Sequence, residues 1–366
     1  MPGEAQVFRL PMSGPDDVSG IVSLITDGSL DPTQIIAILG KTEGNGCVND
    51  FTRGYATQSL RAMLATYLGE AEIARIPLVM SGGTEGGLSP HWIVLSRIET
   101  SGASEVEAEA PALAIAGVIT RPLDPCEIGR SAQAELVRAA VLEAMVHADI
   151  TGPDDVHFVQ IKCPLLTSGR ANSAVGDVAT DNMLKSMGLS RGASALGVAL
   201  ALGEVETITD AQIGTNMLLW SSRASCSAGI ELMACEIIVL GLSRRWSGPL
   251  RIGHEVMQDA IDAPAVARLL AQAVPGAPLQ EAQSGLVAVL AKAEASGSGQ
   301  IRGKRHTMLE DSDISSTRHA RGFVGGMLAG LIGHTELFVS GGAEHQGPDG
   351  GGPVAIIYTS LKGTDA

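Results

Sequence analysis

The sequence has few basic residues, few cysteines and no long hydrophobic run. Its 366 residues include 25 Lys and Arg against 40 Asp and Glu, a net charge of −15. Surfaces that bind nucleic acid or anionic membranes need an excess of positive charge, so neither partner is expected. The five cysteines are odd in number and lack C-x-x-C spacing, which argues against a disulfide framework or a zinc knuckle and favours the reducing cytoplasm.

The longest apolar helical stretches, GASALGVALALG and GFVGGMLAGLIG, are rich in glycine and shorter than the roughly 20 residues that cross a bilayer. The first residues, MPGEAQVFRLPM, do not combine a charged segment with an apolar one, so no signal peptide is expected. Apolar residues still make up 45% of the chain, enough for a large core. We therefore expect a soluble, globular protein.

One short phrase of sequence occurs three times. Each copy reads S-[GA]-G-x-E and is followed by an apolar, β-branched run, which is HWIVLSRI, CEIIVLGL or PVAIIYTSL. Runs of this composition are typical of strands. The three phrases begin at Ser81, Ser227 and Ser340.

Upstream of each phrase is a second strand-like run that ends on a lysine, followed by an Arg-Gly pair that we expect to open a helix. The runs QIIAILGK, VHFVQIK and GLVAVLAK end at Lys41, Lys162 and Lys292. The pairs are Arg53-Gly54, Arg191-Gly192 and Arg321-Gly322. This order predicts an α/β protein with repeat unit A at residues 1–103, unit B at 111–250 and unit C at 251–366. The small, acidic stretch 99–111 is a candidate boundary.

The recurrence of polar residues at element ends points to a functional site, because repeats kept for packing preserve apolar positions. A lysine made neutral by desolvation or by a nearby cation can take the proton of a serine and make it a nucleophile. Arginines supply such cations and donate to carbonyl oxygens. Small residues after each serine, Gly82, Ala228 and Gly341, expose backbone N–H groups that can form an oxyanion hole. Three such sets around one centre would bind a ligand with three equivalent polar edges.

The glutamate four residues after each serine has two open interpretations. Glu85, Glu231 and Glu344 can hold the nearby lysine in place, or they can be solvated side chains. A tight pair would keep its lysine charged, so a base is least expected where such a pair is tight.

Seven motifs together carry a family resemblance. They are GKTEGNGCVNDFTRG, MSGGTEGGLSPHW, VQIKCP, GLSRGASALGVALALGE, SAGIEL, RGFVGGMLAG and SGGAEHQGPDGGGPVA. With these motifs the chain resembles the cyanuric acid hydrolase and barbiturase family, cyclic amide hydrolases with the Toblerone fold, over essentially its whole length. The resemblance implies three similar α/β units around a pseudo-threefold axis, a homotetramer, no organic cofactor, and a planar cyclic imide such as cyanuric acid as the small-molecule substrate.

The resemblance also implies that unit B carries the chemistry, with Ser227 as the nucleophile and Lys162 as its activating base. Ring opening of cyanuric acid would give carboxybiuret, which loses carbon dioxide to form biuret. The phrase of unit B differs from the others, since ASCSAG stands where they have VMSGG and FVSGG. Ser225 and Cys226 are rivals for the nucleophile, although only Ser227 matches the alignment of the three copies. The residues implied to bind substrate are Lys41, Arg53, Ser81, Gly82, Arg191, Ala228, Lys292, Arg321, Ser340 and Gly341.

The glycine-rich loop AEHQGPDGGGP can turn several backbone carbonyls inward, and hard cations take such oxygen ligands. The resemblance implies a structural magnesium or calcium ion at this loop. Its ligands would be Glu294 and the carbonyls of Ala343, Gln346, Gly347, Pro348 and Gly351.

Two alternatives to a cyanuric acid hydrolase stay open. A barbiturase would use the same residues to open barbituric acid to ureidomalonate, with substrate selection expected around Thr317 to Arg321. A binder of planar cyclic imide anions would have no turnover, although the presence of both Lys162 and Ser227 argues against it.

Overall fold

Three four-stranded sheets with the same strand order form the framework of the protein. The computed structural model describes residues 3–99, 110–276 and 278–360. In every sheet the first strand along the chain lies at one edge, next to the last, then the second, then the third. In this order the strands are β1 (Gly3–Pro11), β4 (His91–Glu99), β2 (Ile35–Thr42) and β3 (Leu78–Gly82); β5 (Ala112–Ile119), β8 (Glu236–Ser243), β6 (Val156–Pro164) and β7 (Ala224–Gly229); and β9 (Leu250–Met257), β14 (Gly352–Thr359), β10 (Leu286–Ala293) and β13 (Phe338–Gly341).

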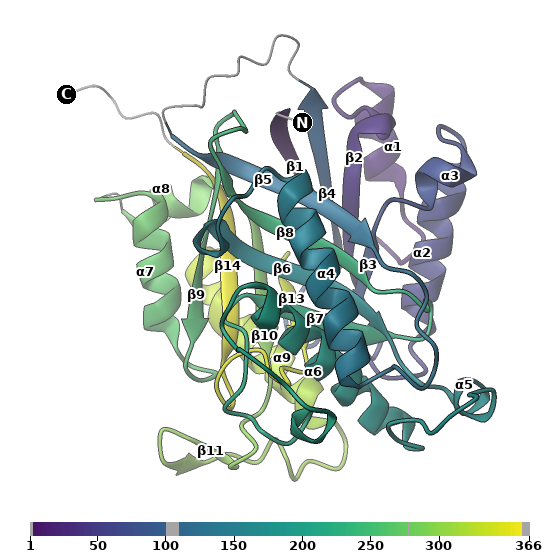
Figure 1. Ribbon diagram of the computed structural model, residues 1–366. Coiled ribbons are helices and arrows are strands. Elements are labelled where there is room, and N and C mark those ends of the chain that lie inside the picture. Colours follow the sequence, from purple (N-terminus) through teal and green to yellow (C-terminus); the bar gives the residue numbers. More distant parts are fainter. Residues whose placement is uncertain (1–2, 100–109, 277, 361–366) are drawn as a thin grey trace.

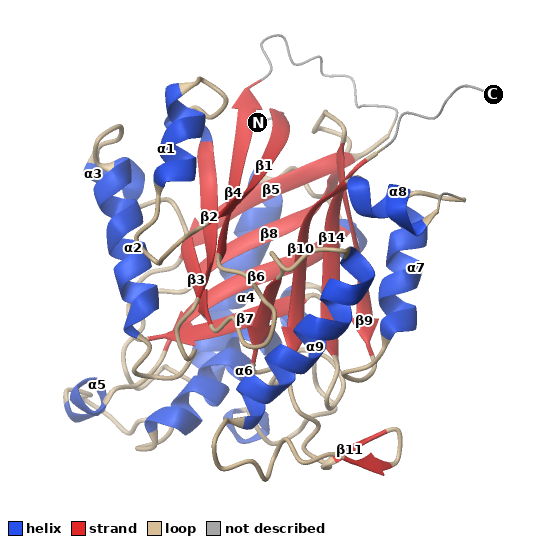
Figure 2. Cartoon of the chain, turned by 180° about the vertical axis from the view of Figure 1, so that it is seen from behind, coloured by secondary structure: helices blue, strands red, loops and turns tan. Residues whose placement is uncertain are grey.

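This threefold identity of topology confirms the prediction of an α/β protein built from three similar units. The exact boundaries between units stay a prediction, and most of the acidic stretch 99–111 lies outside the described residues. The helices cover the outer sides of the sheets, and the sheets face one another in the middle of the molecule (Figures 1 and 2).

Each sheet is accompanied by its own helices. They are α1 (Ser19–Thr26), α2 (Phe51–Leu64) and α3 (Glu70–Ile73); α4 (Ser131–His147), α5 (Ser168–Asn172) and α6 (Met183–Ala201); and α7 (Ala263–Ala273), α8 (Leu279–Ser284) and α9 (Ser316–Ile332). A small hairpin of β11 (Gln300–Ile301) and β12 (Lys304–Arg305) precedes α9. Within the described ranges, no helix combines the length and the apolar character that crossing a membrane requires.

The inner strands β2, β4, β6, β8, β10 and β14 are largely apolar because both of their faces are mostly buried. On β2, Ala37 and Leu39 face a central core shared by all three sheets, while Ile38 faces a separate core beneath α2. Successive side chains of a strand point to opposite faces, so one strand contributes to both cores. In unit C, Leu290 belongs to the central core and Val289 packs with α7 and α9. The central core therefore holds the three units together.

The predicted lysine-ending and post-serine runs are strands within one or two residues, but two features of the fold differ from the prediction. The edge strands β1, β5 and β9 were not predicted, because their sequences carry no member of the repeated polar pattern. Arg53 lies in the first turn of α2, as expected, whereas Arg191 and Arg321 lie inside α6 and α9. Both helices begin earlier than expected. Asn182 caps α6 by accepting the N–H of Lys185, and α9 begins directly after Ser315, whose side chain makes no capping hydrogen bond.

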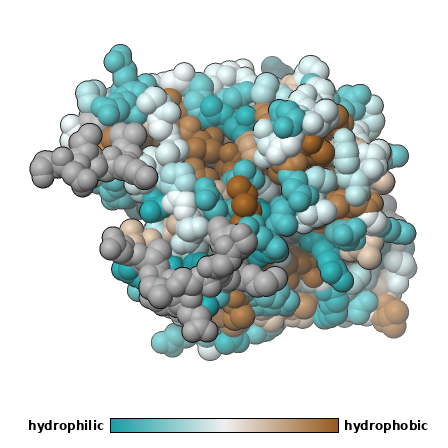
Figure 3. Space-filling model, turned by 90° about the horizontal axis from the view of Figure 1, so that it is seen from above, coloured by the Kyte–Doolittle hydropathy of each residue, from teal (hydrophilic) through white to brown (hydrophobic). Residues whose placement is uncertain are grey.

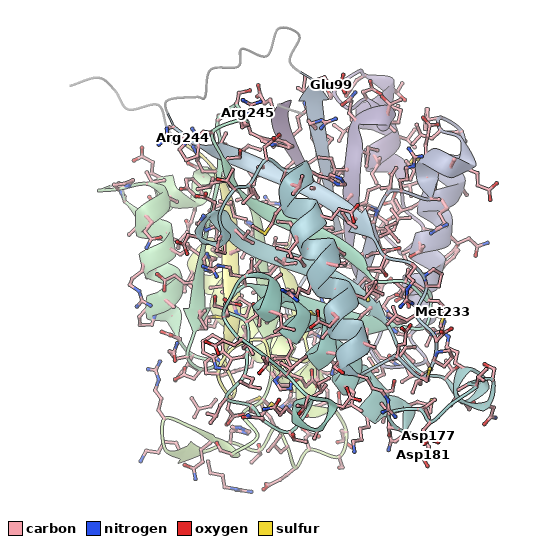
Figure 4. The ribbon with its side chains drawn as sticks, in the orientation of Figure 1. Glu99, Asp177, Asp181, Met233, Arg244 and Arg245 are labelled. Atoms are coloured by element: carbon pink, nitrogen blue, oxygen red, sulfur yellow. The ribbon has the colours of Figure 1, made fainter. Side chains whose placement is uncertain are left out.

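The outer surface is mixed in character. Seen from above, hydrophobic and hydrophilic residues are interspersed (Figure 3). Figure 4 shows Glu99, Arg244 and Arg245 at the upper end of the molecule and Asp177 and Asp181 at the lower end. These charged side chains lie at the periphery, in contrast to the buried charges of the site described next.

Candidate active site

The lysine and the serine of each unit lie side by side on neighbouring parallel strands. Lys41 pairs in register with Ser81, Lys162 with Ser227, and Lys292 with Ser340. Because the paired strands run parallel, each sheet presents both residues at the same end. The repeated sequence pattern is therefore a repeated geometry.

The three serines meet at one small cavity, with an empty volume of about 240 Å³. Nine residues that the sequence singled out line this cavity, and they come from all three units. They are Arg53, Ser81, Gly82, Arg191, Ser227, Ala228, Arg321, Ser340 and Gly341. Gly46 and Met187 also line it and were not predicted. The roles assigned to these residues stay predictions, while their convergence on one cavity is a property of the structure.

The three lysines lie behind the serines rather than in the cavity lining, and they are at most 1% exposed. Lys41 Nζ donates to Ser81 Oγ at 3.3 Å. Lys292 Nζ donates to Ser340 Oγ at 3.2 Å and to the carbonyl oxygen of Cys226 at 2.9 Å. Burial, followed by the nearby Arg191 guanidinium, lowers the pKa of Lys292 to about 7. Burial and then Arg321 likewise hold the pKa of Lys41 well below its ordinary value.

Lys162 has different partners. Its Nζ donates to the carbonyl oxygen of Met80 at 2.6 Å and lies 2.9 Å from Glu231 Oε1. Burial lowers the pKa of Lys162, and the Glu231 carboxylate opposes that shift. Lys162 is thus the lysine of the three that is paired directly with a carboxylate, among the described residues.

Arginines and glutamates of different units form a ring around the cavity. Arg321 of unit C donates from Nε and Nη2 to Glu85 of unit A, at 2.8 and 2.7 Å. Arg191 of unit B donates from the same two atoms to Glu344 of unit C, at 2.8 and 2.6 Å. Two of the glutamates therefore bind an arginine of the neighbouring unit, and neither of the two interpretations offered by the sequence is right for them.

Close approach of these arginines explains the second glycine of the S-G-G phrase. Gly83 has φ +105°, and a Cβ there would lie 2.3 Å from Arg321 Nη2. Gly342 has φ +80°, and its Cβ would lie 2.4 Å from the Arg191 guanidinium. A side chain at either position would be strained and would occupy the place of the guanidinium.

Ser227 is the best placed of the three candidate nucleophiles in unit B. Its Oγ lies 2.8 Å from Ser340 Oγ, and its side chain lines the cavity. Ser225 and Cys226 are fully buried and do not line it. Burial also raises the pKa of the Cys226 thiol well above its ordinary value, which disfavours a thiolate nucleophile.

The loop that follows β13 suits a cation. Burial and the nearby Glu344 carboxylate raise the pKa of Glu294, whose side chain accepts only a 3.3 Å hydrogen bond from Thr317 Oγ1 and one from the N–H of Ala295 among the described residues. The loop is tied to the segment after Glu294, because Ser296 Oγ and Gly297 N–H donate to Asp349. No three His, Cys, Asp or Glu side chains of the described chain cluster as metal ligands, so an ion here would depend on backbone carbonyls.

A family model described as "Amidohydrolase ring-opening protein" (AtzD/TrzD) matches residues 6–359. The chain belongs to this family. The predicted family and the prediction of a hydrolase are therefore confirmed.

Relatives of known name and structure extend the match over whole chains. The chain is 57% identical to the cyanuric acid amidohydrolase of Azorhizobium caulinodans, covering 98% of this chain and 99% of that protein. It is 55% identical to the cyanuric acid amidohydrolase of a Bradyrhizobium strain, covering 96% and 97%. The crystal structure of the A. caulinodans hydrolase superposes with a TM-score of 0.91 at 55% identity, covering 98% of this chain and all of that one. A second cyanuric acid hydrolase structure gives a TM-score of 0.92 at 46% identity. The Toblerone fold is thereby confirmed.

Sequence reasoning missed the two other lining residues and the cross-unit partners. Gly46 precedes α2, with φ +69°, and Arg321 approaches to within 2.9 Å of the position of a Cβ there. Its signal in the sequence was the run GNG, which favours a tight turn. Met187 lies on α6 one turn before Arg191, and nothing in a single helix pattern distinguishes it from a core methionine.

Proposed function

We propose that this protein hydrolyses cyanuric acid, opening its ring to carboxybiuret. The observation that carries the proposal is the convergence of three Lys–Ser pairs in the same register, with three arginines, on one small cavity. Cyanuric acid has three equivalent carbonyl and N–H edges, which suits three equivalent sets of donors and acceptors. The names of the relatives support the same substrate.

In the proposed reaction, Ser227 Oγ attacks a ring carbonyl carbon while its proton passes to the amine of Lys162. Backbone N–H groups beside the serines and the arginine side chains stabilise the oxyanion. The C–N bond then breaks, and the Lys162 ammonium returns its proton to the leaving ring nitrogen. Water, losing a proton to Lys162, attacks the carbamoyl-enzyme; the C–Oγ bond breaks, and the Lys162 ammonium returns the proton to Ser227 Oγ as carboxybiuret is released. The product loses carbon dioxide to form biuret.

The remaining side chains of the cavity hold the ring in this proposal. Ser81 and Ser340, each supported by its own lysine, face two edges of the substrate, and Arg53, Arg191 and Arg321 donate to its oxygens. Arg53 is already fixed for this purpose, because its Nη1 and Nη2 donate to the carbonyl oxygens of Ala228 and Cys47.

A structural magnesium or calcium ion fits the loop after β13. Glu294 and the carbonyls of Ala343, Gln346, Gly347, Pro348 and Gly351 would hold it, and the bound ion supplies positive charge that offsets the repulsion between Glu294 and Glu344. Treatment with EDTA should lower Tm, with recovery on adding magnesium or calcium; an unchanged Tm would contradict this ion site. The homotetramer and the cytoplasmic location stay predictions.

The test is to incubate the purified protein with cyanuric acid and, separately, with barbituric acid, following the loss of ultraviolet absorbance of each ring. Loss of cyanuric acid with formation of biuret is expected. Loss of barbituric acid alone would make the protein a barbiturase. Binding of either ring without turnover would overturn the proposed hydrolysis.

A further inference from the structure

Unit B breaks the threefold pattern of the arginine–glutamate ring. Two of the three pairs are bidentate, with both oxygens of Glu85 and of Glu344 held by an arginine of the neighbouring unit. The third pair should join Arg53 of unit A to Glu231 of unit B. Their closest atoms, Arg53 Nε and Glu231 Oε1, are instead 3.9 Å apart, and the same oxygen lies 2.9 Å from Lys162 Nζ.

This displacement leaves a buried donor without an acceptor. Arg53 is 2% exposed, and its Nε has no hydrogen-bond partner among the described residues, whereas Arg191 Nε and Arg321 Nε each donate to a glutamate at 2.8 Å. Leaving a buried donor without an acceptor is unfavourable, because the group has lost its hydrogen bonds to water. A shorter contact between Arg53 and Glu231 would therefore be favourable, because it would give Arg53 Nε an acceptor.

The glycines beside the serines show the same asymmetry independently. A Cβ on Gly83 or Gly342 would meet a guanidinium group from the neighbouring unit, at 2.3 and 2.4 Å. A Cβ on Gly229 would instead meet the Glu231 carboxylate, at 2.1 Å, with no arginine atom among its three nearest neighbours. In unit B the carboxylate therefore lies where the other two units have the arginine.

We propose that Glu231 is a positioning residue with two partners, and that its move from Lys162 to Arg53 frees Lys162 to act on Ser227. The move needs only about 1 Å, the difference between the 3.9 Å Arg53 contact and the 2.8 Å contacts of the other two arginines. It restores the threefold pattern and gives Arg53 Nε its acceptor. This inference rests on the proposed function, since it concerns the base of that reaction.

The proton balance of the step is simple. While Glu231 faces Lys162, the lysine is an ammonium, which cannot accept the proton of Ser227. When Glu231 moves to Arg53, burial favours the neutral amine, and the ammonium proton passes to water in the cavity. The amine, beside Ser227 in the strand register, then accepts the hydroxyl proton as Oγ attacks.

Other charged groups near Lys162 set the background for a pH experiment. Glu236, beside Lys162 on β8, accepts the N–H of Leu78, and burial raises its pKa to about 7. Cys163 follows Lys162 on β6, and burial raises its thiol pKa. Arg170 interacts with the Glu231 charge, and burial lowers its pKa. The wild type and the variants share these groups, so a difference between their pH profiles measures the effect of the Glu231 carboxylate.

The experiment measures kcat/KM for cyanuric acid against pH in the wild type, Glu231→Gln and Glu85→Gln. Removing the Glu231 carboxylate should move the acid limb of the profile to lower pH by about 1 pH unit or more, because Lys162 loses its stabilising anion. Glu85→Gln is the matched control, since Glu85 binds Arg321 and Arg318 and no lysine. It should reduce the rate without moving the limb.

Three results would overturn the inference. They are an unmoved acid limb in Glu231→Gln, an equal movement in both variants, and a movement in Glu85→Gln alone, which would assign the base to Lys41. Arg53→Lys keeps the charge but loses the pair of guanidinium N–H donors that could bind both oxygens of Glu231, so its limb should move to higher pH. That variant carries the test if Glu231→Gln does not fold, and an unmoved limb there also overturns the inference. Wild-type protein without turnover at any pH would instead refute the proposed function.

Discussion

In units A and C a hydrogen bond joins the lysine to its serine, whereas among the described residues no such bond joins Lys162 to Ser227 in unit B. Lys41 and Lys292 donate to their own serines at 3.3 and 3.2 Å. Lys162 pairs with Ser227 in the same register, yet its Nζ donates to the carbonyl oxygen of Met80 and forms an ion pair with Glu231. Identical strand geometry therefore does not make identical pairs. The partner of one carboxylate decides which lysine carries a stabilised charge.

The site forms only when the three units pack against one another, because lysines of one unit bond to the backbone of another. Lys162 of unit B donates to the carbonyl oxygen of Met80, directly before Ser81 of unit A. Lys292 of unit C donates to that of Cys226, directly before Ser227 of unit B. Each of these two lysines therefore fixes the serine strand of the preceding unit, and the shared central core holds this arrangement in place.

Removing one serine hydroxyl at a time tests whether unit B differs in function from units A and C. Ser227→Ala should lower kcat by about 10³-fold or more, because it removes the proposed nucleophile. Ser81→Ala should cost about 10- to 100-fold in kcat/KM, since it removes one hydrogen bond to the ring. Steady-state kinetics of both variants decide the point. Equal losses of kcat would mean that unit B is not the site of attack.

Lysine replacement gives the next largest effect. Lys162→Ala should lower turnover by about 10²- to 10⁴-fold through loss of the general base, while cyanuric acid still binds to the arginines and the other two serines. Isothermal titration calorimetry of the variant measures binding separately from kcat. Retained turnover would remove Lys162 from the mechanism.

Replacing the glycine two residues after the serine tests whether an arginine lies beside it, because the free energy of unfolding should fall more where one does. Gly83→Ala should destabilise the protein by about 1–3 kcal/mol, because φ is +105° and the new methyl group meets Arg321. Gly229→Ala should cost less, because φ at Gly229 is not in the left-handed region and the atoms it meets are the end of the Glu231 side chain. Urea unfolding of both variants gives the two free energies. A larger loss at Gly229 would contradict the difference between the units.

The smallest expected effect is a pH dependence of stability from a lysine outside unit B. Burial holds the pKa of Lys41 well below its ordinary value of 10.5, so the unfolded chain binds more protons there than the folded one. The resulting cost to folding is complete below the folded-state pKa and disappears as pH rises toward 10.5. The Tm of Lys41→Met minus that of the wild type should therefore be more positive at pH 6 than at pH 9. A Tm difference that does not change with pH would show that the charge of Lys41 does not destabilise the folded protein.

Much of the site was predictable because its lysine, arginine and serine occur three times in the sequence, in the same order. Lys41 and Ser81 terminate strands of strong β composition, so their position and proximity follow from parallel pairing. The strands β1, β5 and β9 were not predictable from the repeat, because their sequences carry no member of the repeated polar pattern. The position of Arg191 inside α6 was missed because capping by Asn182 starts that helix upstream of the Arg-Gly pair, and the position of Arg321 was missed because α9 begins directly after Ser315.

The three α/β units, the Lys–Ser order at strand ends and the family follow from the sequence, since they depend on local composition and on repetition along the chain. The partners of the glutamates become visible only in the folded protein, where Glu85 and Glu344 bind arginines and Glu231 binds Lys162. The reason is physical: these partners lie on different units or on different strands, and differences of about 1 Å between buried charges select the pair. No spacing in the sequence encodes differences of that size.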